Sequence, residues 1–190
     1  MKNIVIFGAP GSGKGTQSDK IIAEFGVEHI STGDVLRSEI KAGTDLGKTA
    51  AMYINDGKLV PDSLIIDMLA ATLDNLGKDI KGVIFDGFPR TIAQAEALDT
   101  MLAECGTKVD TVVGLEVDDD ELIKRIVERG KTSGRADDNA ETAKKRLDTY
   151  YGQTLPLKEF YIKQDKYAKI NGVGSIDEIY ANISAAIKAC

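Results

Sequence analysis

The 190-residue sequence is 43% hydrophobic and 28% charged, the composition of an ordinary globular protein, which excludes a disordered or fibrous one. A chain of this length is expected to fold as one domain, in which roughly 70% of the unfolded surface becomes buried without help from disulfides or a structural metal. With 24 Lys and Arg against 30 Asp and Glu, the net charge of −6 argues against broad binding to nucleic acid or to an anionic membrane.

Predicted strands and helices alternate along the first part of the chain. Continuous apolar runs are typical of buried parallel strands, and apolar residues at helical spacing indicate helices. The elements expected here are strand Ile4–Phe7, helix Gly15–Phe25, strand His29–Ile30, helices Asp34–Lys41, Leu46–Asn55 and Asp62–Leu76, strand Val83–Phe85, helix Ile92–Glu104 and strand Thr111–Val117. Pro61 fits the first turn of the helix that follows it.

The last third of the chain continues this alternation. Its expected elements are a helix from Asp118 to about Arg129, an exposed loop at Lys131–Asn139, a mostly helical segment at Glu141–Gln164, a short strand at Tyr167–Ile170 and a final helix. We expect Gly130 to end the first of these helices and Pro156 to kink the second. The final helix has its apolar residues on one face, namely Ile176, Ile179, Tyr180, Ile183 and Ile187.

Such alternation predicts a doubly wound α/β fold, with a parallel sheet and helices on both of its faces. Right-handed crossovers place the ligand crevice of this fold at the carboxyl ends of the strands. The loops after Phe7 and Phe85 lie at two such ends. We therefore look for the functional site in these two loops.

The first loop, GAPGSGKGT at residues 8–16, follows a strand and opens a helix, as a phosphate-binding loop requires. Its glycines let several main-chain N–H groups point at one phosphate, and the helix N-terminus adds partial positive charge. Lys14 supplies a full positive charge. In the general phosphate-loop pattern a hydroxyl follows the lysine directly, whereas this chain has Gly15 there and Thr16 one residue later. We therefore expect Thr16 to contact magnesium through water.

The second loop begins in the segment VIFDGFPRTIAQ, residues 83–94. Its apolar strand delivers Asp86 to the carboxyl end of the sheet, where P-loop enzymes usually hold magnesium with an acidic residue. Arg90 follows the rigid Pro89, and its guanidinium can bridge two phosphate oxygens, which a lysine cannot do.

Four segments together resemble the adenylate kinase family across essentially the whole chain: GAPGSGKGTQ (8–17), STGDVLR (31–37), DGFPRTIAQ (86–94) and RGKTSGRADDN (129–139). The resemblance implies a P-loop nucleotide kinase that transfers the terminal phosphoryl group of Mg-ATP to AMP. It also implies a core of residues 1–30, 61–129 and 140–190, an AMP-binding insert at 31–60 and a short lid at 130–140. Long-lid members of the family sometimes carry four metal-binding cysteines in the lid, and because this short lid has none, we expect no zinc.

The resemblance also assigns residues to the two nucleotides and to catalysis. It implies ATP contacts at Gly11, Ser12, Gly13, Lys14, Gly15, Thr16, Arg125, Arg129 and Gly174. It implies AMP contacts at Thr32, Arg37, Lys58, Leu59, Val60, Gly87, Phe88, Pro89, Arg90, Gln94, Arg135 and Arg146. The charges expected to act on the transferred phosphoryl group belong to Lys14, Arg90, Arg129, Arg135 and Arg146, with Asp86 holding magnesium through water.

Composition supports these assignments independently. The chain has six arginines against eighteen lysines, and all six arginines fall at the positions just given. Arg125 and Arg129 are four residues apart, so one helix face presents both. We further expect Asp137 and Asp138 to orient the arginines of the lid.

Two features of the sequence favour AMP over other nucleoside monophosphates as the acceptor. The amide of Gln94 offers one donor and one acceptor, which suit N1 and the amino group of adenine. Pyrimidine-monophosphate kinases, which resemble this family, carry asparagines in that part of the motif and lack the threonine found here at Thr32. A UMP/CMP-type kinase is therefore the alternative that we weigh against AMP.

Two further alternatives fit the sequence less well. A GTP-dependent switch would share the phosphate loop, but the TKVD segment at 107–110 precedes a strand instead of following one. A nucleotide-binding module without catalysis would have no reason to keep Lys14 together with the arginines.

The remaining residues indicate the cellular setting. No membrane-length apolar segment or signal-peptide core occurs, and the isolated Cys105 and Cys190 lack metal-ligand spacing, which favours a reducing, cytoplasmic location. Cys105 reads as a small core residue, and His29 as a structural histidine outside the motifs. We expect a monomer, because the hydrophobic positions are used by the predicted core.

Overall fold

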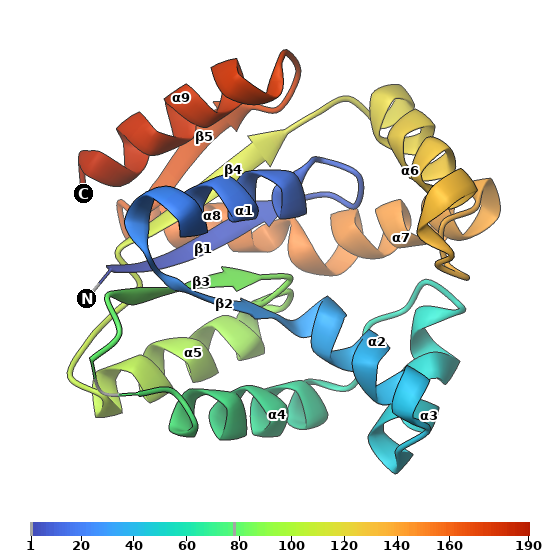
Figure 1. The fold of residues 1–190 in the computed structure, drawn as a ribbon, viewed down its shortest axis with the longest axis horizontal. Coiled ribbons are helices and arrows are strands. Elements are labelled where there is room, and N and C mark those ends of the chain that lie inside the picture. Colours follow the sequence, from blue (N-terminus) through green and yellow to red (C-terminus); the bar gives the residue numbers. More distant parts are fainter. Residues whose placement is uncertain (1, 78) are drawn as a thin grey trace.

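The centre of the structure, a computed structural model that describes residues 2–77 and 79–190, is a sheet of five parallel strands in the order β2-β3-β1-β4-β5 (Figure 1). The strands are β1 (Lys2–Gly8), β2 (Glu28–Ser31), β3 (Gly82–Asp86), β4 (Thr111–Glu116) and β5 (Tyr167–Asn171). The phosphate loop follows β1, the central strand, and the Asp86 loop follows its neighbour β3. The sheet therefore brings the two loops together, as predicted.

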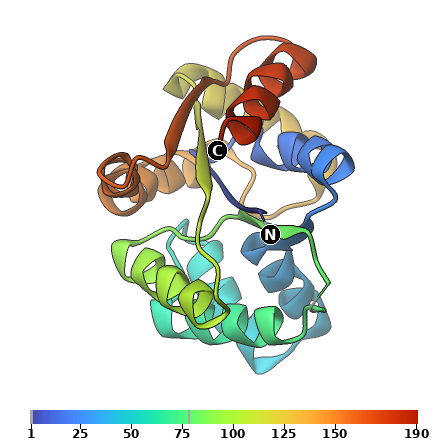
Figure 2. The ribbon, with the colours of Figure 1, turned by 90° about the vertical axis from the view of Figure 1, so that its left-hand side faces the viewer.

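Helices connect successive strands and cover both faces of the sheet (Figure 2). They are α1 (Lys14–Phe25), α2 (Thr32–Ala42), α3 (Asp45–Ile54), α4 (Asp62–Asp74), α5 (Ile92–Glu104), α6 (Asp119–Ser133), α7 (Ala140–Thr149), α8 (Pro156–Ile162) and α9 (Ile176–Lys188), with a π-helical turn, η1 (Tyr150–Thr154), between α7 and α8. None of the helices within the described residues is both long and apolar enough to cross a bilayer.

The side chains of β1 point alternately to the two faces of the sheet and belong to two separate core clusters. Val5 and Phe7 lie in a cluster with buried side chains of α4, α5 and α8, whereas Ile4 and Ile6 lie in a second cluster with side chains of α1 and α9. Successive residues of a strand point to opposite faces, so a strand covered on both faces must be apolar throughout. This requirement explains why the continuous apolar run in β1 identifies a central strand.

Two pairs of helices lie beyond the carboxyl ends of the strands. In Figure 1, α2 and α3 extend from the lower part of that edge, and α6 and α7 lie above them, while both chain termini lie at the opposite edge. The phosphate loop and the Asp86 loop thus lie between these two helix pairs.

The predicted end of α6 is wrong. The helix does not end at Gly130 but continues to Ser133, and Gly134 ends it in the left-handed conformation, with φ of 64°. The predicted loop at Lys131–Asn139 is therefore shorter. Gly130 serves another purpose, because a Cβ there would lie 2.1 Å from the main-chain oxygen of Asp138. The glycine lets the main chain at Asp138 approach the helix closely.

Three smaller expectations also need correction. The 141–164 segment is helical, but its irregularity is the π-helical turn η1, and Pro156 follows it as the first residue of α8, where a proline fits. Cys105 is exposed at the end of α5 and is not a core residue. In α9, Ile179, Ile183 and Ile187 are buried as predicted, whereas Ile176 is 51% exposed.

Candidate active site

The phosphate loop has the backbone geometry that anion binding needs. Gly13 adopts a left-handed conformation with φ of 95° immediately before α1, and the first turn of α1 holds no acidic residue. The partial positive charge of this helix N-terminus is therefore left for a ligand. Gly11 also has positive φ, and a Cβ there would lie 2.8 Å from the Leu122 oxygen in α6. The loop is thus held closely against α6.

Lys14 points back along the loop that carries it. Its Nζ donates hydrogen bonds to the main-chain oxygens of Gly8 (2.8 Å) and Ala9 (3.0 Å). Burial lowers the pKa of Lys14 to about 8. An ammonium group so poorly solvated gains strongly from a nearby anion, which would raise its pKa again.

The main cavity, which we call the phosphate cavity, opens over this loop. It is lined by Gly11, Lys14 and Thr16, by Asp86, and by all six arginines of the chain: Arg37, Arg90, Arg125, Arg129, Arg135 and Arg146. These arginines come from α2, from the loop after β3, from α6, from the loop after it and from α7. The fold therefore gathers cations that lie far apart in the sequence around a single space.

Acidic partners hold some of these arginines in place. Arg129 binds the fully buried carboxylate of Asp138 through two hydrogen bonds of 2.6 and 2.7 Å, and Arg146 lies 2.8 Å from a carboxylate oxygen of Asp137. The two aspartates thus hold arginines on either side of residues 130–140, whereas Arg135, the arginine within that segment, pairs with neither of them. The bidentate pair of Arg129 with Asp138 fixes the direction of the guanidinium as well as its position.

Other arginines remain available to a ligand. Within the described residues, the Arg135 side chain makes no hydrogen bond or ion pair. Arg90 donates through Nε to the Gly87 oxygen at 2.7 Å, and burial together with the nearby charge of Arg146 lowers its pKa to about 10. Crowded cations in a partly dry cavity favour a polyanion.

The structure places His29 in the candidate site, although the sequence indicated only a structural role for this residue. Its Nε2 lies 3.8 Å from a carboxylate oxygen of Asp86, and both residues line the phosphate cavity. Burial opposes ionisation of Asp86, but His29 and Lys14 outweigh it and hold the pKa of this carboxyl below its usual range. The Asp86 carboxylate in turn raises the pKa of His29.

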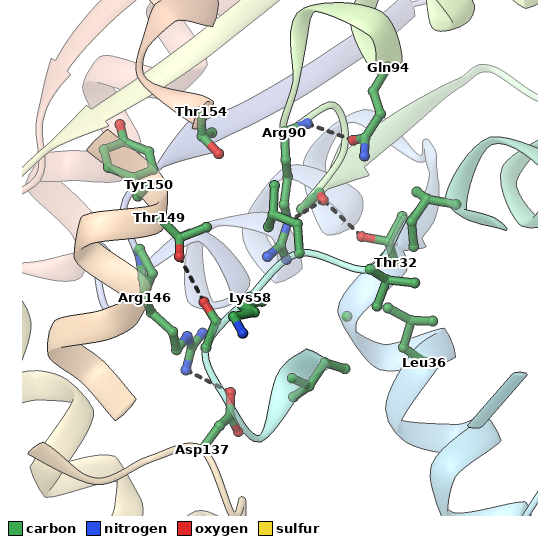
Figure 3. Close-up of a pocket in the computed structure, with 18 of the residues that line it drawn as sticks. Thr32, Leu36, Lys58, Arg90, Gln94, Asp137, Arg146, Thr149, Tyr150 and Thr154 are labelled. Carbon is green, nitrogen blue, oxygen red and sulfur yellow. Dashed lines mark hydrogen bonds and ion pairs between the residues drawn. The ribbon is translucent and has the colours of Figure 1, made fainter. Parts of the chain in front are cut away.

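A second cavity, drawn in Figure 3, shares Arg37, Arg90 and Arg146 with the lining of the phosphate cavity. Its lining includes most of the residues predicted for AMP, namely Thr32, Arg37, Lys58, Leu59, Val60, Gly87, Arg90, Gln94 and Arg146. Thr32 donates to the Gly87 oxygen at 2.9 Å, which ties α2 to the loop after β3. The lining also includes apolar side chains suited to a flat base, Leu36, Ile54 and Ile65.

Several predicted contact residues lie outside the lining of these cavities. Ser12 is buried and its Oγ has no partner in the described part of the chain, Phe88 is a core residue, and Pro89 and Gly174 line neither cavity. Arg135 lines only the phosphate cavity. Conversely, Tyr150 and Thr154 of η1 line the second cavity without having been predicted, because no sequence rule indicated a π-helical turn there.

Oxygen ligands for a small hard cation are present but few. No group of three or more His, Cys, Asp or Glu side chains suited to a metal occurs within residues 2–77 and 79–190. Asp86 and Thr16 both face the phosphate cavity. This set fits Mg²⁺, which keeps most of its waters and binds proteins through one or two carboxylates together with substrate phosphates.

Comparison with known proteins gives a consistent result. The profile of the family described as adenylate kinase matches residues 6–166. The adenylate kinase of Phocaeicola vulgatus is 62% identical over 188 residues, covering 99% of each chain. That of Bacteroides thetaiotaomicron is 62% identical over 187 residues, covering 98% of each chain, and that of Maricaulis maris is 48% identical over 186 residues with the same coverage.

Proposed function

The chain belongs to the adenylate kinase family and transfers a phosphoryl group from ATP to AMP, and from this premise we propose which of its residues perform each part of the reaction. The same finding excludes the UMP/CMP-type kinase and the GTP switch as the main activity. The observation that carries the proposal is the convergence of Lys14 and all six arginines on one cavity above the phosphate loop.

ATP binds with its phosphates on the loop of Gly11, Ser12, Gly13, Lys14, Gly15 and Thr16, where main-chain N–H groups and the start of α1 meet the negative charge. Arg125 and Arg129 lie on the same face of α6 and contact the same nucleotide, one at the adenine and the other at the phosphates. Gly174 supplies a main-chain contact to the adenine. Support comes from Arg125, whose two terminal nitrogens each lie 3.2 Å from the Gly172 oxygen, next to that segment.

AMP occupies the second cavity, with its base toward Gln94 and its phosphate toward the shared arginines. Arg37, Arg90 and Arg146 of this cavity, together with Arg135 from the phosphate cavity, bind this phosphate. The Lys58–Val60 segment lines the base with the help of Thr32 and the Gly87–Arg90 loop. The junction of the two cavities at Arg90 and Arg146 supports this arrangement, because it leaves the two reacting phosphates on either side of one set of cations.

Catalysis then depends on position and charge. The phosphate of AMP is already anionic, so the reaction needs no general base. Arg90, Arg129, Arg135 and Arg146, together with Lys14, stabilise the charge on the transferred group, while Asp137 and Asp138 hold Arg129 and Arg146 in direction. Mg²⁺ bound with ATP would be held by Asp86 and by Thr16 through water, and it supplies additional positive charge to the phosphates.

We also propose the division of the chain. Residues 31–60 form an AMP-binding insert and residues 130–140 a lid, each moving against a core of 1–30, 61–129 and 140–190. The enzyme acts as a cytoplasmic monomer on ATP and AMP, without nucleic acid, membrane or zinc. Support for a monomer is that the large exposed apolar side chains stand on separate elements, such as Met52 on α3 and Ile162 on α8.

Two substitutions test the assignment of the two cavities. Gln94→Leu should raise KM for AMP by about tenfold and leave KM for ATP unchanged, because it removes two neutral hydrogen bonds to one base. Arg125→Met should raise KM for ATP and leave KM for AMP unchanged. Steady-state kinetics of both variants, with CMP and UMP as further acceptors, provides the measurement. A rise in the wrong KM, or equal rises in both, would overturn the assignment.

A further inference from the structure

The amide of Gln94 is held at both of its ends. The Arg90 main-chain N–H donates to Gln94 Oε1 at 2.8 Å, a contact drawn in Figure 3. Gln94 Nε2 donates to Oδ1 of Asp62 at 2.8 Å. The Gln94 side chain is only 2% exposed and lines the second cavity, whereas Asp62 lines neither cavity.

These two partners allow one orientation of the amide. A main-chain N–H can only donate a hydrogen bond, and an ionised carboxylate can only accept one. If the amide of Gln94 were flipped, its NH₂ would face the N–H of Arg90 and its oxygen would face the carboxylate of Asp62. Both contacts would then be repulsive, and buried polar groups left without a partner are costly.

Asp62 is itself fixed in place. Its second oxygen, Oδ2, accepts a hydrogen bond from Thr91 Oγ1 at 2.9 Å, and Thr91 Oγ1 accepts from the Gln94 main-chain N–H at 3.2 Å as the cap of α5. Asp62 is also the first residue of α4, where the helix favours a negative charge. The carboxylate therefore joins the starts of α4 and α5 and cannot turn away from Gln94 without losing these contacts.

The fixed orientation determines which hydrogen bonds the amide of Gln94 can still make to a ligand. One lone pair of Oε1 and one N–H of Nε2 remain unused. Adenine presents an amino donor at position 6 and an acceptor at N1, which complement this pair. A 6-oxopurine presents an acceptor at position 6 and a donor at N1, which would require the flipped amide.

We propose that Asp62 is a positioning residue for base specificity, which orients Gln94 so that the enzyme accepts 6-aminopurine monophosphates and rejects 6-oxopurine monophosphates. This inference rests on the proposed function, in which Gln94 contacts the base of the acceptor nucleotide. Asp62 acts through Gln94 and does not touch the substrate.

The test measures kcat/KM for AMP and for IMP, with ATP as donor, in the wild type and in Asp62→Asn. The asparagine in this variant can offer its NH₂ to Gln94 and so favour the flipped amide. We expect the preference for AMP over IMP to fall by about tenfold or more. Asp177→Asn is the matched control, because Asp177 likewise lies in the first turn of a helix, α9, but its side chain is 88% exposed and lines neither cavity. Its preference should equal that of the wild type.

A double-mutant comparison separates positioning from a general structural effect. If Asp62 acts through Gln94, then Asp62→Asn changes the AMP-to-IMP ratio in the wild type but not in the Gln94→Leu background. An equal change in both backgrounds would overturn the inference. Should Asp62→Asn fail to fold, Asp62→Glu provides a second test, because it keeps an acceptor-only group and should retain most of the preference for AMP. Loss of the preference in folded Asp62→Glu would also overturn it.

The results also distinguish this inference from the proposed function. If Gln94→Leu leaves the AMP-to-IMP ratio unchanged, the assignment of Gln94 to the base is wrong. If Gln94→Leu abolishes the preference while folded Asp62→Asn retains it, the assignment of Gln94 stands and the role of Asp62 is refuted.

Discussion

The arginines of the phosphate cavity differ in how the protein holds them. Arg129 and Arg146 are paired with buried aspartates, whereas the Arg135 side chain has no hydrogen bond or ion pair among the described residues. A guanidinium without a protein partner contributes little to folding and is free to bind phosphate oxygens in pairs. Arg135 is therefore the arginine whose loss should affect catalysis most selectively.

We predict that Arg135→Ala lowers kcat by about 10³- to 10⁵-fold, the range found for arginine fingers in phosphoryl transfer. Its thermal midpoint should stay within about 2 °C of the wild type, because no side-chain hydrogen bond or ion pair within the described residues is lost. Lys131→Ala, which removes another cation of the same segment, is the control and should retain nearly full activity. A decrease of less than tenfold for Arg135→Ala would argue against its proposed role.

The pKa of Lys14 predicts a pH dependence. Because burial lowers this pKa to about 8, the free enzyme loses the positive charge of Lys14 as the pH rises through 8. Since kcat/KM reports ionisations of the free enzyme, kcat/KM for ATP should fall above pH 8, whereas kcat should hold to higher pH because bound phosphates stabilise the ammonium. In Lys14→Arg the fall should move to higher pH. A fall at the same pH in that variant would assign it to another group.

Sequence reasoning predicted candidate site residues where local pattern and chemistry coincide. The phosphate loop was predicted from its glycines, its lysine and its place between a strand and a helix, and the six arginines all line the cavity as expected. His29 was missed because its partner Asp86 lies on another strand, in a register that the sequence does not reveal. The link from Asp62 to Gln94 joins two helix starts 32 residues apart and leaves no local signal.

At the scale of elements, both ends of α5 were predicted correctly, whereas the end of α6 was not. The start of α5 at Ile92 follows the cap Thr91, and its end at Glu104 was also predicted correctly. In α6, two glycines compete as terminators, and only Gly134 adopts the left-handed conformation. The choice depends on the packing of the Asp138 main chain against Gly130, a tertiary contact that propensity rules do not include.

This contact predicts an unusual response to substitution. Gly→Ala within an exposed helix normally stabilises a protein by about 1 kcal/mol. At Gly130 the added Cβ would lie 2.1 Å from the Asp138 oxygen, so we expect Gly130→Ala to lower the free energy of unfolding by about 1–3 kcal/mol. The measurement is urea unfolding followed by circular dichroism.

Gly152→Ala is the control for this experiment, because a Cβ at Gly152 in η1 meets nothing within 4 Å. This variant should be as stable as the wild type or more so. If Gly130→Ala were equally stable, the close approach of the lid segment to α6 would not exist in solution.

At the scale of the whole molecule, the parallel sheet and its helices followed from the alternation of apolar runs, because a βαβ chain has few ways to cover both faces of a sheet. The contacts between distant segments did not follow from it. The Thr149 hydroxyl donates to the Gly57 oxygen at 2.9 Å, and Lys145 lies 3.4 Å from Asp56. These contacts join the end of the proposed AMP-binding insert to α7, the helix that follows the proposed lid.

Because the arginines of the insert and the lid share one cavity, a ligand bearing both sets of phosphates should order both segments together. Arg37 of α2 and Arg135 of the lid both line the phosphate cavity, and their like charges repel each other until an anion lies between them. Closing both segments would also exclude water, the competing acceptor of the phosphoryl group.

We therefore predict that a bisubstrate analogue, two adenosines joined by a polyphosphate, slows amide hydrogen exchange in residues 31–60 and 130–140 by about tenfold or more. Amides of β1 that precede the phosphate loop, and amides of α9, are the internal control. Their exchange should change little, since they belong to the packed core. ATP alone should protect the lid segment more than the insert, and AMP alone the insert more than the lid. Nearly equal exchange in both segments with and without the analogue would contradict the proposed division into a core and two moving parts.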